Sequence, residues 1–152
     1  MPTNTAAAAS RGLADIIAAV IAAAEKKGAS KKPPQNASLF PRFIRQFYAG
    51  SPPDELVGRT PEALCDAAAS VWELLQNRKA GSPKIKISST GDRAVIQIVN
   101  DDMPFLVSSI SCELERMDMG ALLVIHPVLT LQRDVDGNLT ALVRLALGMM
   151  TL

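Results

Sequence analysis

The sequence has few of the residues that most often carry enzyme chemistry. Its 152 residues include one histidine and two cysteines, Cys65 and Cys112. Neither cysteine has the close Cys or His neighbour that a zinc site requires, so both are expected to be buried, reduced thiols. Aromatic residues make up only 4% of the chain. The core must therefore be built mainly from Leu, Ile, Val, Ala and Met.

Strong charge and long apolar runs are also missing. A net charge of +1 gives no global field that would attract nucleic acid or an acidic membrane. The apolar stretch over residues 13–24 is interrupted by Asp15, and it is too short to span a bilayer. It also lacks the basic flank of a signal peptide. We therefore expect a cytoplasmic protein with no nucleic-acid partner and no membrane partner.

The motifs of common catalytic sites are absent as well. There is no Gly-rich nucleotide loop, no P-loop and no nucleophile elbow. Asp134 to Asn138 resembles a calcium loop, but Gly137 is at the fourth position instead of the sixth, so a hairpin turn is expected. His126 lies in an apolar stretch and is predicted to be a structural histidine with its hydrogen bonds satisfied. The sequence predicts no catalytic residue and no metal ligand.

The first half of the chain has helical periodicity. Residues 1–9 are predicted to be a flexible leader, after which Ser10 caps a helix that ends near Lys27. Two further helices are expected over residues 38–49 and from Thr60-Pro61 to about residue 77. Residues 10–81 thus form a helical segment.

The second half, residues 82–152, changes to strand patterns. The alternation of Lys and Ile over residues 84–88 is typical of a half-buried strand, with its lysines in solvent and its isoleucines inward. Strands are expected over 84–88, 94–99, 121–131 and 139–150, with a helix over 104–119 and a hairpin turn at Asp136-Gly137. Strands on either side of the 104–119 helix would need a right-handed crossover if they were parallel. The fold class is α+β: N-terminal helices, then a ferredoxin-like β-β-α-β-β sheet, antiparallel or mixed, with helices on one face.

The polar turn between the second strand and the following helix is the candidate site. It reads Asn100-Asp101-Asp102-Met103-Pro104. Backbone N–H groups at such a turn can bind an anion or a carboxylate. The side chains of Asn100, Asp101 and Asp102 can hydrogen-bond a ligand ammonium group. The alternative is that Asp101 or Asp102 only caps the helix while Pro104 occupies its first turn.

One run of residues carries a family resemblance. The sequence Ile-Val-Asn-Asp-Asp-Met-Pro-Phe-Leu-Val over residues 98–107 is followed by Ile125-His126-Pro127-Val128 and by Arg133-Asp134-x-x-Gly137. Together they resemble the N-terminal region of the large bacterial class of NAD-specific glutamate dehydrogenase. The resemblance covers about residues 40–142.

This resemblance implies that residues 82–152 form an ACT-like domain truncated within a longer protein. The parent enzyme would oxidise L-glutamate with NAD to 2-oxoglutarate and ammonia, whereas this chain would hold neither NAD nor catalytic residues. Its role would be regulatory or in assembly, with Asn100, Asp101 and Asp102 binding an amino-acid effector. Phe105 stands where ligand-binding ACT modules have Gly, so its side chain is expected to fill the pocket. Ser108 also replaces an expected acidic residue.

Two alternatives belong to other functional classes. One is a free-standing regulatory module that binds an amino acid. The other is a purely structural oligomerisation module that pairs through an exposed strand edge or through the first helix. In each case the expected partners are further copies of the chain, the rest of a parent chain, or a small amino acid.

Overall fold

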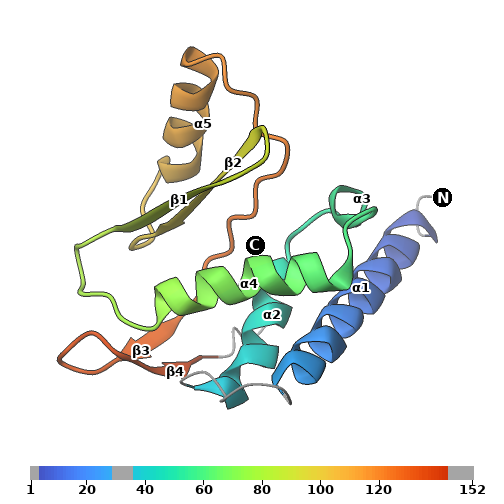
Figure 1. Ribbon diagram of the computed structural model, residues 1–152, viewed down its shortest axis with the longest axis horizontal. Helices are drawn as coiled ribbons and strands as arrows, with labels where there is room; N and C mark the ends of the chain where they lie inside the picture. The colour runs from blue at the N-terminus through green and yellow to red at the C-terminus, as the bar shows by residue number, and fades with distance from the viewer. Residues whose placement is uncertain (1–3, 29–35, 144–152) are drawn as a thin grey trace, which may run out of the picture.

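The computed structural model describes residues 4–28 and 36–143. Figure 1 shows a group of packed helices with a small hairpin beside them, which we call the helical unit (α1–α4, β3, β4), and a hairpin with one helix, which we call the hairpin–α5 unit (β1, β2, α5). The elements are α1 (Asn4–Gly28), the short 3-10 helix η1 (Ala37–Leu39), α2 (Phe40–Tyr48), α3 (Pro53–Leu56), α4 (Pro61–Leu75), β1 (Lys84–Thr90), β2 (Arg93–Val99), α5 (Leu106–Arg116), β3 (Leu131–Arg133) and β4 (Leu139–Leu142).

The helices of the first half largely follow the sequence pattern. At the start of α4, the Thr60 hydroxyl accepts a hydrogen bond from the Ala63 N–H at 3.2 Å, and Pro61 takes the first helical position, as predicted. The start of α1 was predicted wrongly, because the helix begins at Asn4 and not at Ser10. The alanines at 6–9 have the highest helix propensity of any residue type, so they extend the helix instead of forming a leader before it.

Most of the chain's few aromatic rings lie in the core of the helical unit. The Phe43 and Trp72 ring centroids lie 5.0 Å apart, and Phe43 also stacks on Phe47 at 5.2 Å. The Tyr48 hydroxyl donates to the Leu64 carbonyl at 2.7 Å, and burial raises the pKa of this phenol. Helix α1 packs against α2, α3 and α4 and covers this cluster with Val20 and Ile21. The first helix therefore belongs to the body of the domain.

The hairpin of β3 and β4 is attached to the end of α4 by backbone hydrogen bonds. The Leu139 N–H donates to the Gln76 carbonyl at 2.8 Å, and the Arg78 N–H donates to the Gly137 carbonyl at 2.9 Å. Gly137 has a φ of 85°, and a Cβ atom there would lie 2.8 Å from the Arg78 carbonyl oxygen. The predicted turn at Asp136-Gly137 is therefore confirmed, and its glycine is required both by conformation and by space.

The hairpin of β1 and β2 is also confirmed, in a regular antiparallel register from Lys84 opposite Val99 to Thr90 opposite Arg93. One face of it lies on α4, where the Ser70 hydroxyl donates to the Gln97 side-chain oxygen at 2.9 Å. Val99 and Gln97 are buried on this face. One of the two faces of the β1–β2 hairpin thus packs against the helical unit.

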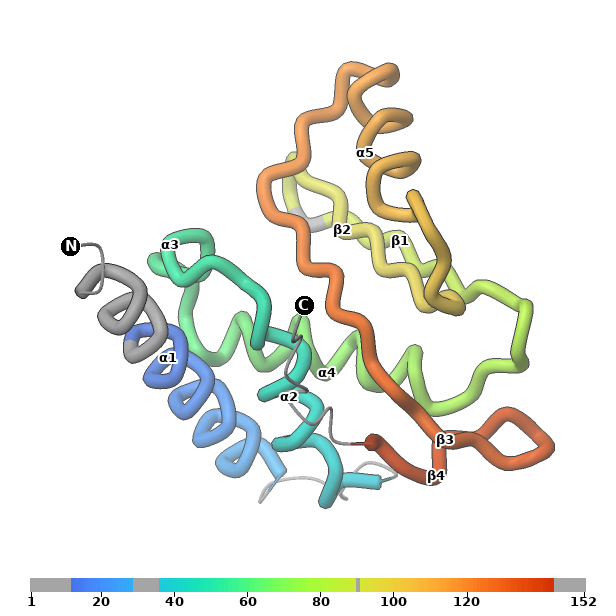
Figure 2. The backbone as a smooth tube through the Cα atoms, turned by 180° about the vertical axis from the view of Figure 1, so that it is seen from behind, coloured from blue at the N-terminus to red at the C-terminus, as the bar shows by residue number. Residues whose placement is uncertain are grey.

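The predicted single ferredoxin-like sheet is not found among the described residues. There are two separate two-stranded sheets, β1–β2 and β3–β4. In Figure 1, α5 and α4 lie on opposite sides of the β1–β2 hairpin instead of on one face. Residues 121–130 run as an extended segment between the two units (Figure 2), and Leu131, the first residue of β3, is the only residue of the predicted 121–131 strand that forms a ladder among the described residues. A strand is defined by its partner, and sequence patterns do not show the partner.

The remaining boundaries differ less. Helix α5 covers 106–116 of the predicted 104–119, and β4 confirms residues 139–142 of the strand expected over 139–150, whose last residues lie outside the described part. Cys65 is buried as expected, whereas Cys112 is exposed, which corrects its prediction. Within residues 4–28 and 36–143, no helix has both the length and the apolar character needed to cross a bilayer.

Candidate functional site

Asp101 ties the predicted site to the end of α4. The Arg78 guanidinium donates to one carboxylate oxygen of Asp101, and the Gly81 N–H donates to the other at 2.8 Å. The side chain of Arg78 is buried and also donates to the Ser82 carbonyl at 3.1 Å. The hydrogen bond from Arg78, followed by that from Gly81, lowers the pKa of Asp101. Both oxygens of this carboxylate are thus used within the chain.

The other two predicted ligand residues lie apart from this contact. The Asn100 side-chain amide approaches the Met103 sulfur at 3.6 Å, and Asp102 is exposed. Neither Asp101 nor Asp102 caps α5, because the residue at the cap position is Phe105 and no side chain caps the helix. The capping alternative is therefore wrong. Effector binding by Asn100, Asp101 and Asp102 stays a prediction.

Phe105 occupies an unusual position at the start of α5. Its φ of 62° lies in the left-handed region, which side chains with a Cβ atom rarely adopt. Its ring is 81% exposed, so the expectation that it fills a pocket is wrong. The Ser109 N–H and the Ser108 hydroxyl donate to the Phe105 carbonyl at 2.8 and 3.1 Å and hold the turn in place. The positive φ explains why a glycine suits this position.

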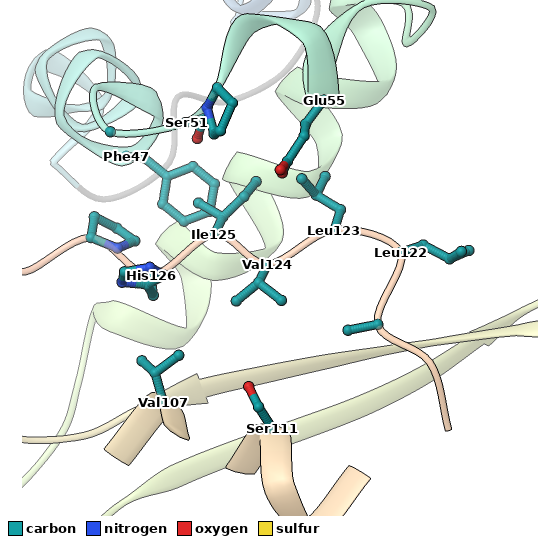
Figure 3. A pocket seen from close by; sticks show the side chains of 14 residues that line it. Phe47, Ser51, Glu55, Val107, Ser111, Leu122, Leu123, Val124, Ile125 and His126 are labelled. Carbon is teal, nitrogen blue, oxygen red and sulfur yellow. The ribbon is translucent and has the colours of Figure 1, made fainter. Parts of the chain in front are cut away.

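A cleft of about 490 Å³ lies where the two units meet (Figure 3). Ile125 points from the extended segment toward Phe47 and Leu123 toward Glu55, whereas Val124 points the other way. His126 is exposed instead of satisfied in the core, which corrects its predicted structural role. The lining residues come from α2, α3 and the turn between them, from α5 and from the extended segment: Phe47, Gly50, Ser51, Pro52, Glu55, Val107, Ser111 and residues 121–127.

Sequence reasoning did not find this cleft, because residues 121–127 were expected inside a sheet. The cleft has polar groups at Ser51, Glu55, Ser111 and His126 beside apolar walls. None of Asn100, Asp101 and Asp102 lines it. No group of three or more Asp, Glu, His or Cys side chains in the described part of the chain is arranged to hold a metal ion. The arrangement suits binding of a small polar molecule better than metal chemistry.

The most distinctive surface is an exposed face of the β1–β2 hairpin, which we call the isoleucine face. Ile85 lies opposite Ile98 and Ile87 opposite Ile96, so all four side chains share one face. They are 61%, 36%, 67% and 42% exposed, respectively. The alternation of Lys and Ile in β1 predicted a half-buried strand with the isoleucines inward. The structure shows the reverse, because the opposite face, with Gln97 and Val99, is the one that packs on α4.

Helix α5 is equally incomplete in its packing. None of its residues is buried, although Leu106, Ile110 and Leu114 follow one another at helical spacing. It has no extensive contact with another element in the described ranges. The helix and the isoleucine face together form a unit whose apolar side chains are only partly covered within residues 4–28 and 36–143.

Comparison with known proteins decides the family. The family model for the glutamate dehydrogenase ACT1 domain matches residues 43–148, which is more than half of the chain. The chain belongs to this family. The match runs from α2 into the segment after β4 and therefore covers both units, whereas α1 lies before it. The resemblance seen in the sequence is thereby confirmed.

Two curated relatives are NAD-specific glutamate dehydrogenases. That of Halomonas elongata is 30% identical over 105 residues, and that of Pseudomonas aeruginosa is 26% identical over 105 residues. Each alignment covers 64% of this chain but only 6% of the relative. The ACT1 domain thus corresponds to a small part of a much longer enzyme. No solved structure matches the chain.

Proposed function

We propose that the chain is a non-catalytic assembly domain of a large NAD-dependent glutamate dehydrogenase. The parent enzyme would oxidise L-glutamate with NAD to 2-oxoglutarate and ammonia, and its NAD site would lie outside this chain. The domain would hold the enzyme together by docking its isoleucine face on another part of the same enzyme. The proposal rests on the family and on the surface that the chain leaves uncovered.

The isoleucine face is the observation that carries this proposal. Contiguous exposed apolar side chains mark protein interaction sites more often than single exposed ones do. Here four isoleucines form one face of a hairpin, and Ile85 and Ile87 are each more than 60% exposed. The matched region makes up 6% of the relatives' length, so most of such an enzyme is available to cover this face.

Paired substitutions on this face test the assembly function. Ile87→Lys combined with Ile96→Glu places opposite charges directly across the hairpin, so it should leave the hairpin itself intact. In the enzyme that contains this domain, we expect the double variant to dissociate or to expose the domain to protease. Sedimentation velocity measures the assembly state, and NADH formation with L-glutamate measures activity.

Val135→Lys is the matched control, because Val135 is 100% exposed but lies in the β3–β4 turn, far along the chain from the isoleucine face. It should leave assembly unchanged. Normal assembly of the Ile87→Lys, Ile96→Glu enzyme would overturn the proposal. Equal loss of assembly in the control would also count against it, because the effect would then not depend on this face.

Regulation by an amino acid is the second candidate, and the cleft is the observation that favours it. Its volume of about 490 Å³ and its mixture of apolar walls with Glu55, Ser51 and His126 suit a small polar ligand. Glutamate or aspartate at a hundred times its dissociation constant would stabilise the chain by about 2.7 kcal/mol. A thermal shift that disappears in Glu55→Gln would support a site in the cleft, and a shift that disappears in Asp102→Asn would place it at the predicted turn. No shift with any amino acid would remove this candidate.

A further inference from the structure

The lining of the cleft has a negative charge without a lysine or an arginine to balance it. Among the described residues that line the cleft, Glu55 is the only carboxylate, and His126 is the other titratable residue. A cleft with a negatively charged wall attracts cations and repels anions. The charge of the lining therefore favours a cationic ligand over one that has a carboxylate.

The Glu55 carboxylate has no partner of its own among the described residues. No ion pair within residues 4–28 and 36–143 involves it. Arg59 donates from its Nε to the Glu55 backbone carbonyl at 3.3 Å instead of to the carboxylate. Figure 3 shows Leu123 of the extended segment pointing toward Glu55. Such an apolar neighbour lowers the local dielectric constant, so this carboxylate attracts a cation more strongly than it would in open solvent.

Ser51 supplies a second oxygen atom on the same wall of the cleft. Ser51 lines the cleft and is only 7% exposed. Its N–H donates to the Tyr48 carbonyl at 3.0 Å, whereas no hydrogen bond of its hydroxyl is found in the part of the chain that the structure describes. A buried hydroxyl without a partner is costly, so a ligand that donates a hydrogen bond to it gains free energy. Ser51 and Glu55 thus offer two acceptors to one donor group.

We propose that the cleft binds the primary ammonium group of a small alkylamine. An ammonium group is a compact charge with three N–H donors, so it can donate to the Glu55 carboxylate and to the Ser51 hydroxyl at the same time. The alkyl chain would lie against the apolar part of the lining, which includes Phe47, Leu123 and Ile125. Apolar walls with a few polar groups that fix the orientation are typical of sites for small molecules.

This inference rests on the second candidate function, in which the cleft is a ligand site, and narrows the class of its ligand. An amino acid brings an ammonium group but also a carboxylate, for which the described lining has neither lysine nor arginine. An amine without a carboxylate should therefore bind more tightly than glutamate or aspartate. Assembly through the isoleucine face does not depend on this ligand, because none of the four isoleucines lines the cleft.

Titration of the complete, isotope-labelled 152-residue chain in NMR experiments tests the proposal. The ligands are pentylammonium, pentan-1-ol and pentanoate, which share one alkyl chain and differ in the head group, at neutral pH and constant ionic strength. We expect pentylammonium to bind with a Kd on the order of a few millimolar and to shift the amide signals of Ser51, Glu55 and Leu123, but not that of Ile87. Pentan-1-ol should bind about tenfold more weakly, because it lacks the charge-assisted hydrogen bond. Pentanoate should give no saturable shift.

Glu55→Gln should weaken the binding of pentylammonium by about tenfold, which brings it close to that of pentan-1-ol. Asp54→Asn is the matched control, because Asp54 is also an exposed carboxylate on α3 but does not line the cleft. Both substitutions change the net charge by the same amount. We expect Asp54→Asn to leave the Kd within about twofold of the original value.

Three results would overturn the inference: no saturable shift with pentylammonium, equal binding of pentanoate, or equal weakening by Glu55→Gln and Asp54→Asn. The last would mean that the net charge of the surface, and not the cleft, attracts the amine. Binding of glutamate without binding of pentylammonium would overturn this inference but leave the second candidate function in place. If neither glutamate nor pentylammonium binds, both are wrong, while the assembly function is still decided by the isoleucine-face variants.

Discussion

The helical unit and the hairpin–α5 unit place their apolar side chains in opposite ways. In the helical unit, Phe43, Tyr48 and Trp72 are at most 1% exposed and contact one another or neighbouring helices. In the hairpin–α5 unit, Ile85 and Ile87 are more than 60% exposed, and α5 has no buried residue. The first unit is held by its own core, whereas the second leaves an apolar surface exposed.

The two hairpins make the same contrast at the level of single residues. The turn of β3–β4 is fixed to α4 through Gly137, Arg78 and Leu139, and two of its leucines, Leu139 and Leu142, are buried. The turn of β1–β2 at Gly91 has no atom within 4 Å of where a Cβ would be. The β3–β4 hairpin is thus packed against the core, whereas the β1–β2 hairpin, although also two-stranded and antiparallel, leaves one face exposed.

Replacement of one buried aromatic ring should give the largest effect. We expect Phe43→Ala to lower the free energy of unfolding by about 3–5 kcal/mol, because it removes a ring in contact with Trp72 and Phe47 and leaves a cavity. Ile87→Ala, in the uncovered face, should change it by less than about 0.5 kcal/mol in the isolated chain. Urea unfolding followed by the fluorescence of Trp72 measures both. Equal losses of unfolding free energy in Phe43→Ala and Ile87→Ala would contradict the difference in packing between the two units.

Glycine replacement in the two turns sharpens the comparison. Gly137→Ala should cost about 2 kcal/mol or more, because its positive φ is strained for alanine and its Cβ would lie 2.8 Å from the Arg78 carbonyl oxygen. Gly91→Ala should cost only about 1 kcal/mol, since the φ of 64° is strained but the space is open. Thermal unfolding of the two variants provides the test. A greater loss from Gly91→Ala would contradict the packing described for the β3–β4 turn.

The contact between Arg78 and Asp101 joins the two units and gives a dependence on pH. The folded-state pKa of Asp101 lies below its unfolded value, so ionised Asp101 stabilises the fold above about pH 4, and this contribution is lost as the pH falls through the folded-state pKa. Asp101→Asn should therefore be less stable than the original chain at pH 7, with a difference that shrinks toward pH 3.

Asp92→Asn is the control for this prediction, because the Asp92 side chain is 96% exposed and its carboxylate oxygen lies 3.9 Å from Nε of the adjacent Arg93. Its stability should follow that of the original chain at both pH values in urea unfolding. An Asp101→Asn difference that persists unchanged at pH 3 would show that the carboxylate charge is not the cause.

The smallest effect is expected at Phe105. Phe105→Gly relieves the left-handed conformation but gives the unfolded chain more freedom, so the two terms nearly cancel. We expect stabilisation by at most about 1 kcal/mol in chemical denaturation. A loss of more than about 2 kcal/mol would mean that the exposed ring makes contacts within the chain that the structure does not show.

Much of the local structure was predictable from the sequence. Thr60-Pro61 marked the start of α4, Asp136-Gly137 marked the β3–β4 turn, and the alternation of Lys and Ile marked β1. These features depend on residues close together in the chain. The same is true of the run over residues 98–107, which was enough to indicate the family.

The features that the sequence did not predict depend on contacts between residues that lie far apart in the chain. The sequence showed that Ile85 and Ile87 share a face but not that α4 would cover the other one. The sequence also did not show that Arg78 donates to Asp101 from the end of α4, because nothing near Asp101 in the chain reveals this contact. The cleft lined by Phe47 and Leu123 was missed for the same reason, since its walls come from distant segments.

Hydrogen exchange of this domain, alone and within the intact enzyme, tests the assembly function most directly. The amides of α2 and α4 should be protected to the same degree in both states, because the side chains that pack on these helices belong to the same chain. Those of β1, β2 and α5 should become protected only in the intact enzyme, where the isoleucine face is covered. Equal, weak protection of the hairpin–α5 unit in both states would contradict the proposal that this face assembles the enzyme.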